Sequence, residues 1–259
     1  MFAQEGITNQ PGQMDLMRQA LRLGCDSVGS APYCDPLPVE NIRAVFDLAA
    51  ELSVDVDFHL DYHLEGKESY LQSVIDETIS RGWQNRVCLG HMTYLSTLPR
   101  AKLEEVGAKL KDAGISVLSL PASDMCMMAR ADDGNRRRGV CPVNQLHACG
   151  VTAAYATNNV QNLFTFTGDG DVLKVGTLLC QTLQLTSESN AALCLEMATT
   201  TAARALNVSH SLAPGMPADL LILEGASALE IVAAPPVERI VIKKGKVVAR
   251  TVCKRQLFR

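Results

Sequence analysis

Two histidines close apolar, β-branched runs of the sequence. His59 is the last residue but one of the run 54–60, and His91 is the last residue of the run 86–91. In parallel α/β folds the carboxyl ends of neighbouring strands meet on one face, where active sites form. Either histidine alone would more often be a packed or loop residue. Because both stand at matching places, we expect the two imidazoles to lie together and to bind a metal ion or transfer a proton.

A short loop after the first of these runs gathers further polar groups. It begins with Asp61, Tyr62 and His63, which bring a carboxylate, a phenol and another imidazole. Together these groups could bind a metal ion, relay a proton or hold a polar heterocycle. Asp61 could equally cap the loop, and we expect His63 to be exposed.

Neutral amides follow a third apolar run, at 151–156. Asn158, Asn159, Gln161 and Asn162 come directly after it. Amide groups donate and accept hydrogen bonds without carrying a charge. This segment therefore predicts a binding place for a polar, uncharged ligand.

Strand-like runs alternate with stretches of helical period from residue 1 to about residue 206, which is typical of a parallel sheet covered by helices. Glycine often follows the helical stretches, where a left-handed residue can end a helix. The methionine-rich run 125–128 is expected to pack as a lid or core segment. The predicted strands are 1–4, 26–31, 54–60, 86–91, 115–120 and 151–156, and the predicted helices are 14–23, 39–52, 69–81, 101–113, 144–148, 172–185 and 191–206.

The pattern changes near residue 206. Strand-like runs follow at 218–223, 238–243 and 246–252, and Lys244-Gly245 can form a hairpin turn between the last two. We therefore expect an α/β unit over 1–206 and a β-rich segment over 207–259. The length of 259 residues matches the roughly 250 of a (β/α)₈ barrel, but only five to six βα units are found. The predicted fold class is α/β, a partial TIM (β/α)₈-type barrel with a small C-terminal β-rich segment.

Composition narrows the partners and the compartment. The formal net charge of −4 gives no general attraction to polyanions, so no nucleic-acid partner is expected. No run reaches the ~20 apolar residues of a membrane span, and the N-terminus lacks the pattern of a signal peptide. Nine cysteines without a C-x-x-C pair are typical of thiols in a reducing compartment. We expect a cytoplasmic protein and, because an open barrel exposes sheet edges, a homo-oligomer.

A set of motifs, taken together, resembles one family. Each motif is weak alone, but their order and spacing, which cover essentially the whole chain, are similar to the cytosine-deaminase-like branch of the amidohydrolase superfamily. Residues 214–223 and 241–250 resemble the strand-forming tail of the same enzymes. The other motifs are Phe2-Ala3-Gln4-Glu5-Gly6-Ile7, Asp57-Phe58-His59-Leu60-Asp61, Leu89-Gly90-His91-Met92-Thr93, Arg137-Arg138-Gly139 and Ala156-Thr157-Asn158-Asn159-Val160.

The resemblance implies a metal-dependent barrel hydrolase. Such an enzyme attacks a C–N bond of a small cyclic amide or amidine with water activated on one divalent ion, zinc or iron. The resemblance also implies that Gln4 hydrogen-bonds the substrate, that His59 binds the metal and that His91 orients the attacking water. Asn158 stands in place of an aspartate that touches the metal and carries a proton. Tyr62 stands where the deaminases have a glutamate that protonates the ring.

The chain departs from the family pattern at Asn158, at Tyr62 and in one missing motif. An amide is a weaker ligand for a hard cation than a carboxylate, and it cannot accept a proton as a carboxylate does. A phenol with a pKa of about 10 is a poor substitute for a glutamate. The chain also has no His-x-His pair, which the family carries at the end of its first strand. Catalytic zinc normally takes three protein ligands, so we expect an incomplete metal site.

The residues and the resemblance leave three functions open. The first is a hydrolase that cleaves a C–N bond of a small nitrogen heterocycle. The second is a non-catalytic or degenerate homologue that binds a ligand or a partner without turnover. The third is a metal-independent lyase or hydratase. For the first, the predicted catalytic residues are His91, Asn158 and Tyr62, the predicted substrate contacts are Gln4, Asp61 and Asn159, and the predicted metal ligand is His59.

Overall fold

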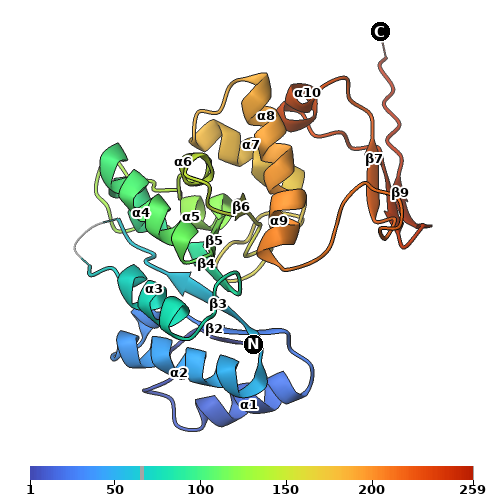
Figure 1. The fold of residues 1–259 in the computed structure, drawn as a ribbon. Coiled ribbons are helices and arrows are strands. Elements are labelled where there is room, and N and C mark those ends of the chain that lie inside the picture. The colour runs from blue at the N-terminus through green and yellow to red at the C-terminus, as the bar shows by residue number, and fades with distance from the viewer. Residues whose placement is uncertain (65–66, 259) are drawn as a thin grey trace. The chain divides into compact units, whose positions relative to one another are not determined.

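A computed structural model describes residues 1–64 and 67–258 of the chain, and the chain divides into two units, Met1–Gly170 and Asp171–Arg259. The first unit holds a parallel sheet with helices, and the second holds helices and a small antiparallel sheet (Figure 1). The change from helices to strands that the sequence indicates follows α9 (Thr200–Ala205). The division into 1–206 and 207–259 stays a prediction.

The sheet of the first unit has six strands, and each strand pairs in parallel with the next one along the chain. All six predicted strands are present, with ends within two residues of the predicted ones, so the α/β class is confirmed. The partial barrel stays a prediction, because β1 and β6 are the two ends of the strand order in the described residues. The strands are β1 (Phe2–Ala3), β2 (Ser27–Ser30), β3 (Asp55–Leu60), β4 (Val87–His91), β5 (Ile115–Ser119) and β6 (Ala153–Tyr155).

The strand β3 shows how the sheet sends side chains to two faces. Its buried Phe58 packs on Phe46 of α2 (Pro38–Leu52), with ring centroids 5.9 Å apart. Successive side chains of a strand point to opposite faces. His59 therefore points away from the face that α2 covers, which leaves its imidazole available to a site.

Proline starts two helices of the first unit. Its fixed φ suits the first helical turn, and Pro38 and Pro121 begin α2 and α5 (Pro121–Met127). The sequence does not predict α5, whose second half contains most of the methionine-rich run 125–128. The remaining helices of this unit are α1 (Gln13–Arg22), α3 (Leu71–Ser80), α4 (Arg100–Asp112) and α6 (Val143–Ala148), with 3₁₀ turns η1 (Pro32–Cys34) and η2 (Thr93–Thr97).

The second unit combines helices with three antiparallel strands. Lys244 and Gly245 connect β8 to β9, and both have positive φ, 49° and 75°, as in the two-residue turns that match strand twist. The predicted helix 191–206 is two helices, because the chain leaves helical geometry at Thr199. The elements are α7 (Val172–Thr182), α8 (Glu188–Met197), α9, β7 (Leu220–Leu223), α10 (Ala228–Ala233), β8 (Arg239–Lys243) and β9 (Lys246–Thr251).

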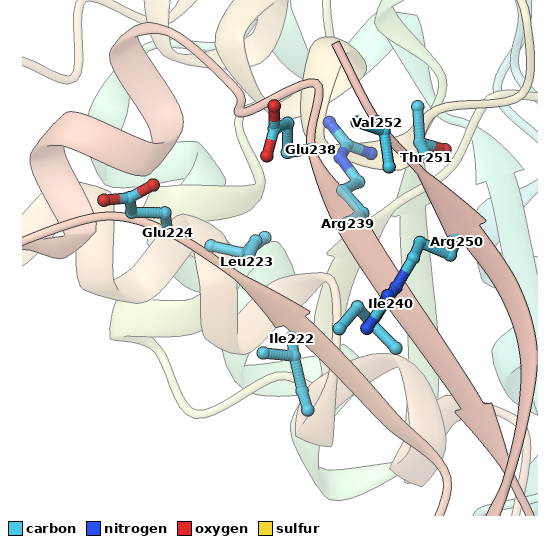
Figure 2. A pocket seen from close by; sticks show the side chains of 9 residues that line it. All are labelled: Ile222, Leu223, Glu224, Glu238, Arg239, Ile240, Arg250, Thr251 and Val252. Atoms are coloured by element: carbon cyan, nitrogen blue, oxygen red, sulfur yellow. The ribbon is translucent and has the colours of Figure 1, made fainter.

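A pocket of about 380 Å³ lies on the antiparallel sheet (Figure 2). Side chains from β7, β8 and β9 line it, among them Ile222, Ile240 and Arg250. None of the predicted site residues belongs to this pocket.

Among the helices of residues 1–64 and 67–258, none is long and apolar enough to cross a membrane. The expected self-association, the expected cytoplasmic location and the expected lack of a nucleic-acid partner stay predictions.

Candidate active site

Six of the seven predicted site residues line a single cavity in the first unit. These six residues lie at or shortly after the carboxyl ends of four parallel strands, β1, β3, β4 and β6. Side chains that the sequence places at strand ends thus lie together in one place in the structure. The lining residues are Gln4, Tyr33, His59, Tyr62, His91, Met127, Asn158, Asn159 and Phe164.

Three of the predicted residues have a left-handed backbone. Asp61, His91 and Asn158 have φ values of 46°, 70° and 59°. This region is uncommon for residues other than glycine, although Asn, Asp and His enter it more readily than most. Each of the three lies at or just after a strand end, where the chain turns sharply. Such strain collects at functional sites, which agrees with a site at this edge of the sheet.

The two imidazoles lie in direct contact. The ring centroids of His59 and His91 are 4.6 Å apart with planes at 82°, and the ring of Tyr62 lies 4.9 Å from that of His91. Burial lowers the pKa of His59 to about 3, and the neighbouring His91 adds to this effect. His59 is therefore a neutral imidazole at neutral pH.

His91 is held by a carboxylate that the sequence analysis missed. Nδ1 of His91 lies 2.7 Å from Oδ1 of Asp124 in α5, and both side chains are buried. Burial raises the pKa of Asp124 above its ordinary value, and the hydrogen bond to His91 opposes the rise. A sequence signal did exist: Asp124 is an acidic residue among apolar ones shortly after the predicted strand 115–120.

Ser123, the neighbour of Asp124, contacts the amide segment after β6. Its Oγ accepts hydrogen bonds from Nδ2 of Asn158 at 3.1 Å and from the backbone N and Nδ2 of Asn159, both at 3.3 Å. Ser123 is fully buried. The amides predicted to bind a ligand are thus fixed by the protein.

Asp61 is the predicted site residue that does not line the cavity. Its carboxylate accepts hydrogen bonds from Ser69 Oγ at 2.5 Å and from the backbone N of Tyr70 at 3.0 Å, so it holds the loop after β3. Burial raises the pKa of this carboxyl group. The contact of Asp61 with a substrate stays a prediction. The expectation that His63 is exposed is wrong, because it is buried against Tyr94 at a ring distance of 5.2 Å.

Tyr62 contributes a hydroxyl group to the cavity. This hydroxyl is buried and has no hydrogen-bond partner in the described part of the chain. Burial raises the pKa of Tyr62, and the nearby charge of Asp124 raises it further. The phenol therefore stays protonated at neutral pH, where it can donate a hydrogen bond but is no base.

The donor groups of this chain do not fit a complete zinc or iron site. In residues 1–64 and 67–258 there is no group of three or more His, Cys, Asp or Glu side chains that could hold a metal ion. The cavity offers the imidazole of His59, that of His91, whose Nδ1 is engaged by Asp124, and the neutral amide of Asn158. Catalytic zinc normally takes three protein ligands. Two solved structures that share the fold do contain zinc.

The fold and the cavity define an α/β protein with a polar site at the carboxyl ends of parallel strands. The model of the amidohydrolase family matches residues 30–252, and the chain belongs to this family. The resemblance read from the motifs is thereby confirmed.

Two sequence relatives and one solved structure show how far the similarity extends. The chain is 27% identical over 257 residues to N-isopropylammelide isopropyl amidohydrolase of a Pseudomonas species, which covers 96% of this chain and 60% of that protein. It is 30% identical over 210 residues to a pterin deaminase of Rhizobium rhizogenes, covering 78% and 47%. The structure of 5-methylcytosine deaminase from Klebsiella pneumoniae with 5-fluorocytosine has a TM-score of 0.90 at 27% identity, covering 99% and 64%. The chain therefore spans less than two thirds of the length of each.

Proposed function

We propose that this chain binds a small, uncharged nitrogen heterocycle and takes part in hydrolysis of one of its C–N bonds. The observation that carries the proposal is the cavity itself, where a buried His91–Asp124 pair meets neutral amide groups. The relatives named for ammelide, pterin and 5-methylcytosine support the substrate class.

The lining of the cavity suits a flat polar ring. Its nine residues include no Asp, Glu, Lys or Arg, so a ligand there meets no formal charge from the lining. Tyr33, Tyr62 and Phe164 offer aromatic surface, against which a planar ring packs well. Gln4 and Asn158 offer amide groups for the edge of such a ring.

His91 is the residue placed to move a proton. With Nδ1 bound to Asp124, Nε2 is the ring nitrogen left for a ligand or water. In the reaction, the oxygen of water forms a bond to the ring carbon, the electron pair of the ring C=N bond moves onto the ring nitrogen, and one proton of the water passes to Nε2. The exocyclic C–N bond then breaks as that proton passes to the departing ammonia or amine. The remaining hydroxyl proton moves to the ring nitrogen, which leaves a ring carbonyl beside a ring N–H. General acid–base catalysis of this kind contributes about 100- to 10,000-fold to a rate.

Product analysis of the full chain tests this proposal. Cytosine, pterin and N-isopropylammelide are incubated with it, with and without added zinc, and ammonia, amine and ring products are measured by mass spectrometry. We expect release from at least one compound and a loss of about 100-fold or more in His91→Gln. His210→Gln, which changes a histidine of the second unit, is the matched control. Release that is equal in wild type and His91→Gln, or none at all, would overturn the proposal.

A second function, ligand binding without turnover, is favoured by one observation. The described donor groups fall short of a metal site, whereas two solved structures that share the fold contain zinc. In that case calorimetry shows binding of cytosine or pterin while no product forms with or without zinc. If product forms in wild type and not in His91→Gln, the chain is a hydrolase and binding without turnover is excluded.

A further inference from the structure

The helix α5 contacts both sides of the cavity through two adjacent residues. Asp124 binds Nδ1 of His91 at the end of β4, and Ser123 binds Asn158 and Asn159 after β6. Both α5 residues are fully buried. Buried polar side chains that find such partners hold those partners in one orientation.

The hydrogen bonds around Ser123 also decide which amide is left for a ligand. Oδ1 of Asn162 accepts from the backbone N of Phe164 and of Thr165, at 3.0 and 3.1 Å, so its Nδ2 is the donor to Oδ1 of Asn159 at 2.7 Å. Asn159 thus has both ends of its amide engaged by protein. Asn158 gives its Nδ2 to Ser123, and its Oδ1 has no partner in the described part of the chain.

We propose that Ser123 and Asp124 are positioning residues that set the hydrogen-bonding pattern of this cavity. Asp124 keeps the proton of His91 on Nδ1, so that Nε2 faces the ligand as a proton acceptor. Ser123 holds Asn158 so that Oδ1 accepts an N–H group. The preferred ligand is then a heterocycle with a ring N–H or an amino group beside the carbon that is attacked. This inference rests on the proposed function for its substrate, but the two orientations exist without any ligand.

The state of the His91 ring tests the part played by Asp124. Nitrogen-15 NMR of the full chain distinguishes the two imidazole tautomers, and the His91→Gln spectrum assigns the signals. We expect the Nδ1–H form in wild type and a mixture of tautomers in Asp124→Asn, because an amide can either accept or donate. If turnover is found, kcat in Asp124→Asn falls about 100-fold with KM within about 3-fold. A wild-type ring in the Nε2–H form, or an unchanged spectrum in Asp124→Asn, overturns the assignment whether or not the protein is an enzyme.

The side-chain amide signals of Asn158 and Asn159 test the part played by Ser123. We expect both signals to shift in Ser123→Ala and to return toward wild type in Ser123→Thr, which restores a hydroxyl. Ser123→Cys keeps the volume, weakens the acceptor and gives the same shift if Ser123→Ala does not fold. Ser119→Ala is the matched control, since Ser119 is equally buried and its hydroxyl has no partner in the described residues.

Ligand affinity adds a second measurement for Ser123. Cytosine binding measured by calorimetry is expected to weaken about 10-fold in Ser123→Ala, which corresponds to one lost hydrogen bond, and to stay unchanged in Ser119→Ala. Amide signals that do not move in Ser123→Ala, or that move equally in Ser119→Ala, overturn the inference. Failure of wild type to bind cytosine or pterin counts against the proposed function, and the amide signals still decide on Ser123.

Discussion

The imidazole rings of His59 and His91 meet edge to face, with centroids 4.6 Å apart and planes at 82°. They come from neighbouring parallel strands, in which His59 pairs with Gly90 and Leu60 pairs with His91. The register therefore brings together two residues that are 32 positions apart in the sequence. His59 is neutral, the form in which an imidazole binds a metal, and Nδ1 of His91 is bound to Asp124, so the pair offers a metal ion at most two ring nitrogens.

We expect the purified full chain to hold less than one equivalent of zinc or iron. The reason is that the described residues supply two imidazoles and one amide where catalytic zinc normally takes three protein ligands. Metal content is measured by mass spectrometry after dialysis against metal-free buffer. His59→Ala is the test variant and His147→Ala the control, since His147 does not line the cavity. If wild type and His147→Ala each hold one full equivalent of metal and His59→Ala holds none, the donor set is complete and this prediction is wrong.

Asp35 ties the segment after β1, next to Gln4, to the start of α2. Its carboxylate accepts hydrogen bonds from the backbone N of Ile7 at 2.6 Å, of Thr8 at 2.9 Å and of Leu37 at 3.0 Å, from Nδ2 of Asn41 at 2.9 Å, and from the hydroxyl of Thr8. Burial alone would raise the pKa of Asp35, but these hydrogen bonds outweigh burial and lower the pKa well below its usual value. Asp35→Asn should lower the free energy of unfolding by about 2 kcal/mol at pH 7, since a hydrogen bond to a charged group contributes about 1.5–3 kcal/mol.

The pH dependence of this effect has a definite sign. The pKa of Asp35 is lower in the folded than in the unfolded chain, so its stabilisation is present above about pH 4 and is lost as the pH falls toward the folded pKa. The difference in free energy of unfolding between wild type and Asp35→Asn, measured from urea unfolding curves, should therefore become smaller below pH 4. Asp15→Asn, on the exposed side of α1, should cost less than about 1 kcal/mol. If this difference in free energy of unfolding stays constant from pH 7 to pH 3, the role given to the Asp35 carboxylate is wrong.

Two strand glycines form a matched pair for a test of the sheet. A Cβ on Gly29 of β2 would lie 1.6 Å from the backbone oxygen of Asp57 in β3, whereas one on Gly90 of β4 would meet side-chain atoms at 3.4 Å. Backbone atoms of a paired strand cannot move aside as a side chain can. We expect Gly29→Ala to lose more than about 3 kcal/mol of stability or to fail to fold, and Gly90→Ala to lose about 1 kcal/mol or less. Thermal unfolding compares the two, and equal stability of the two variants would contradict this account.

The sequence predicts the strands and their convergence well because both are local in origin. The runs that carry His59 and His91 at or next to their ends are apolar and β-branched, and strands in sequence order place their carboxyl ends on one edge. The burial of His63 could not be predicted in this way. Its burial depends on Tyr94, 31 positions further along the chain, and no local pattern shows that contact.

The short helix α5 is the largest omission, and it matters most for the site. Seven residues that begin with proline and mix polar with apolar side chains give too short a helical pattern to predict. The hydrogen bond between His91 and Asp124 joins residues 33 positions apart, so neither residue indicates it locally. The cavity could be predicted from strand ends, whereas the groups that orient its side chains could not.

Tyr62 offers a test that separates folding from binding. Its buried hydroxyl has no hydrogen-bond partner in the described part of the chain and the cavity is beside it, so the missing partner would be a ligand or water. Replacing an unpaired buried hydroxyl with hydrogen costs the folded state nothing, and Tyr62→Phe should leave the free energy of unfolding unchanged or raise it by about 1 kcal/mol. Cytosine affinity, measured by calorimetry, should fall about 10-fold because one hydrogen bond is lost. Tyr94→Phe, outside the cavity lining, is the control. It should change the cytosine affinity by no more than about 2-fold and the free energy of unfolding by no more than about 0.5 kcal/mol. A large loss of stability in Tyr62→Phe would mean that the hydroxyl serves the fold, and unchanged affinity would mean that no ligand reaches it.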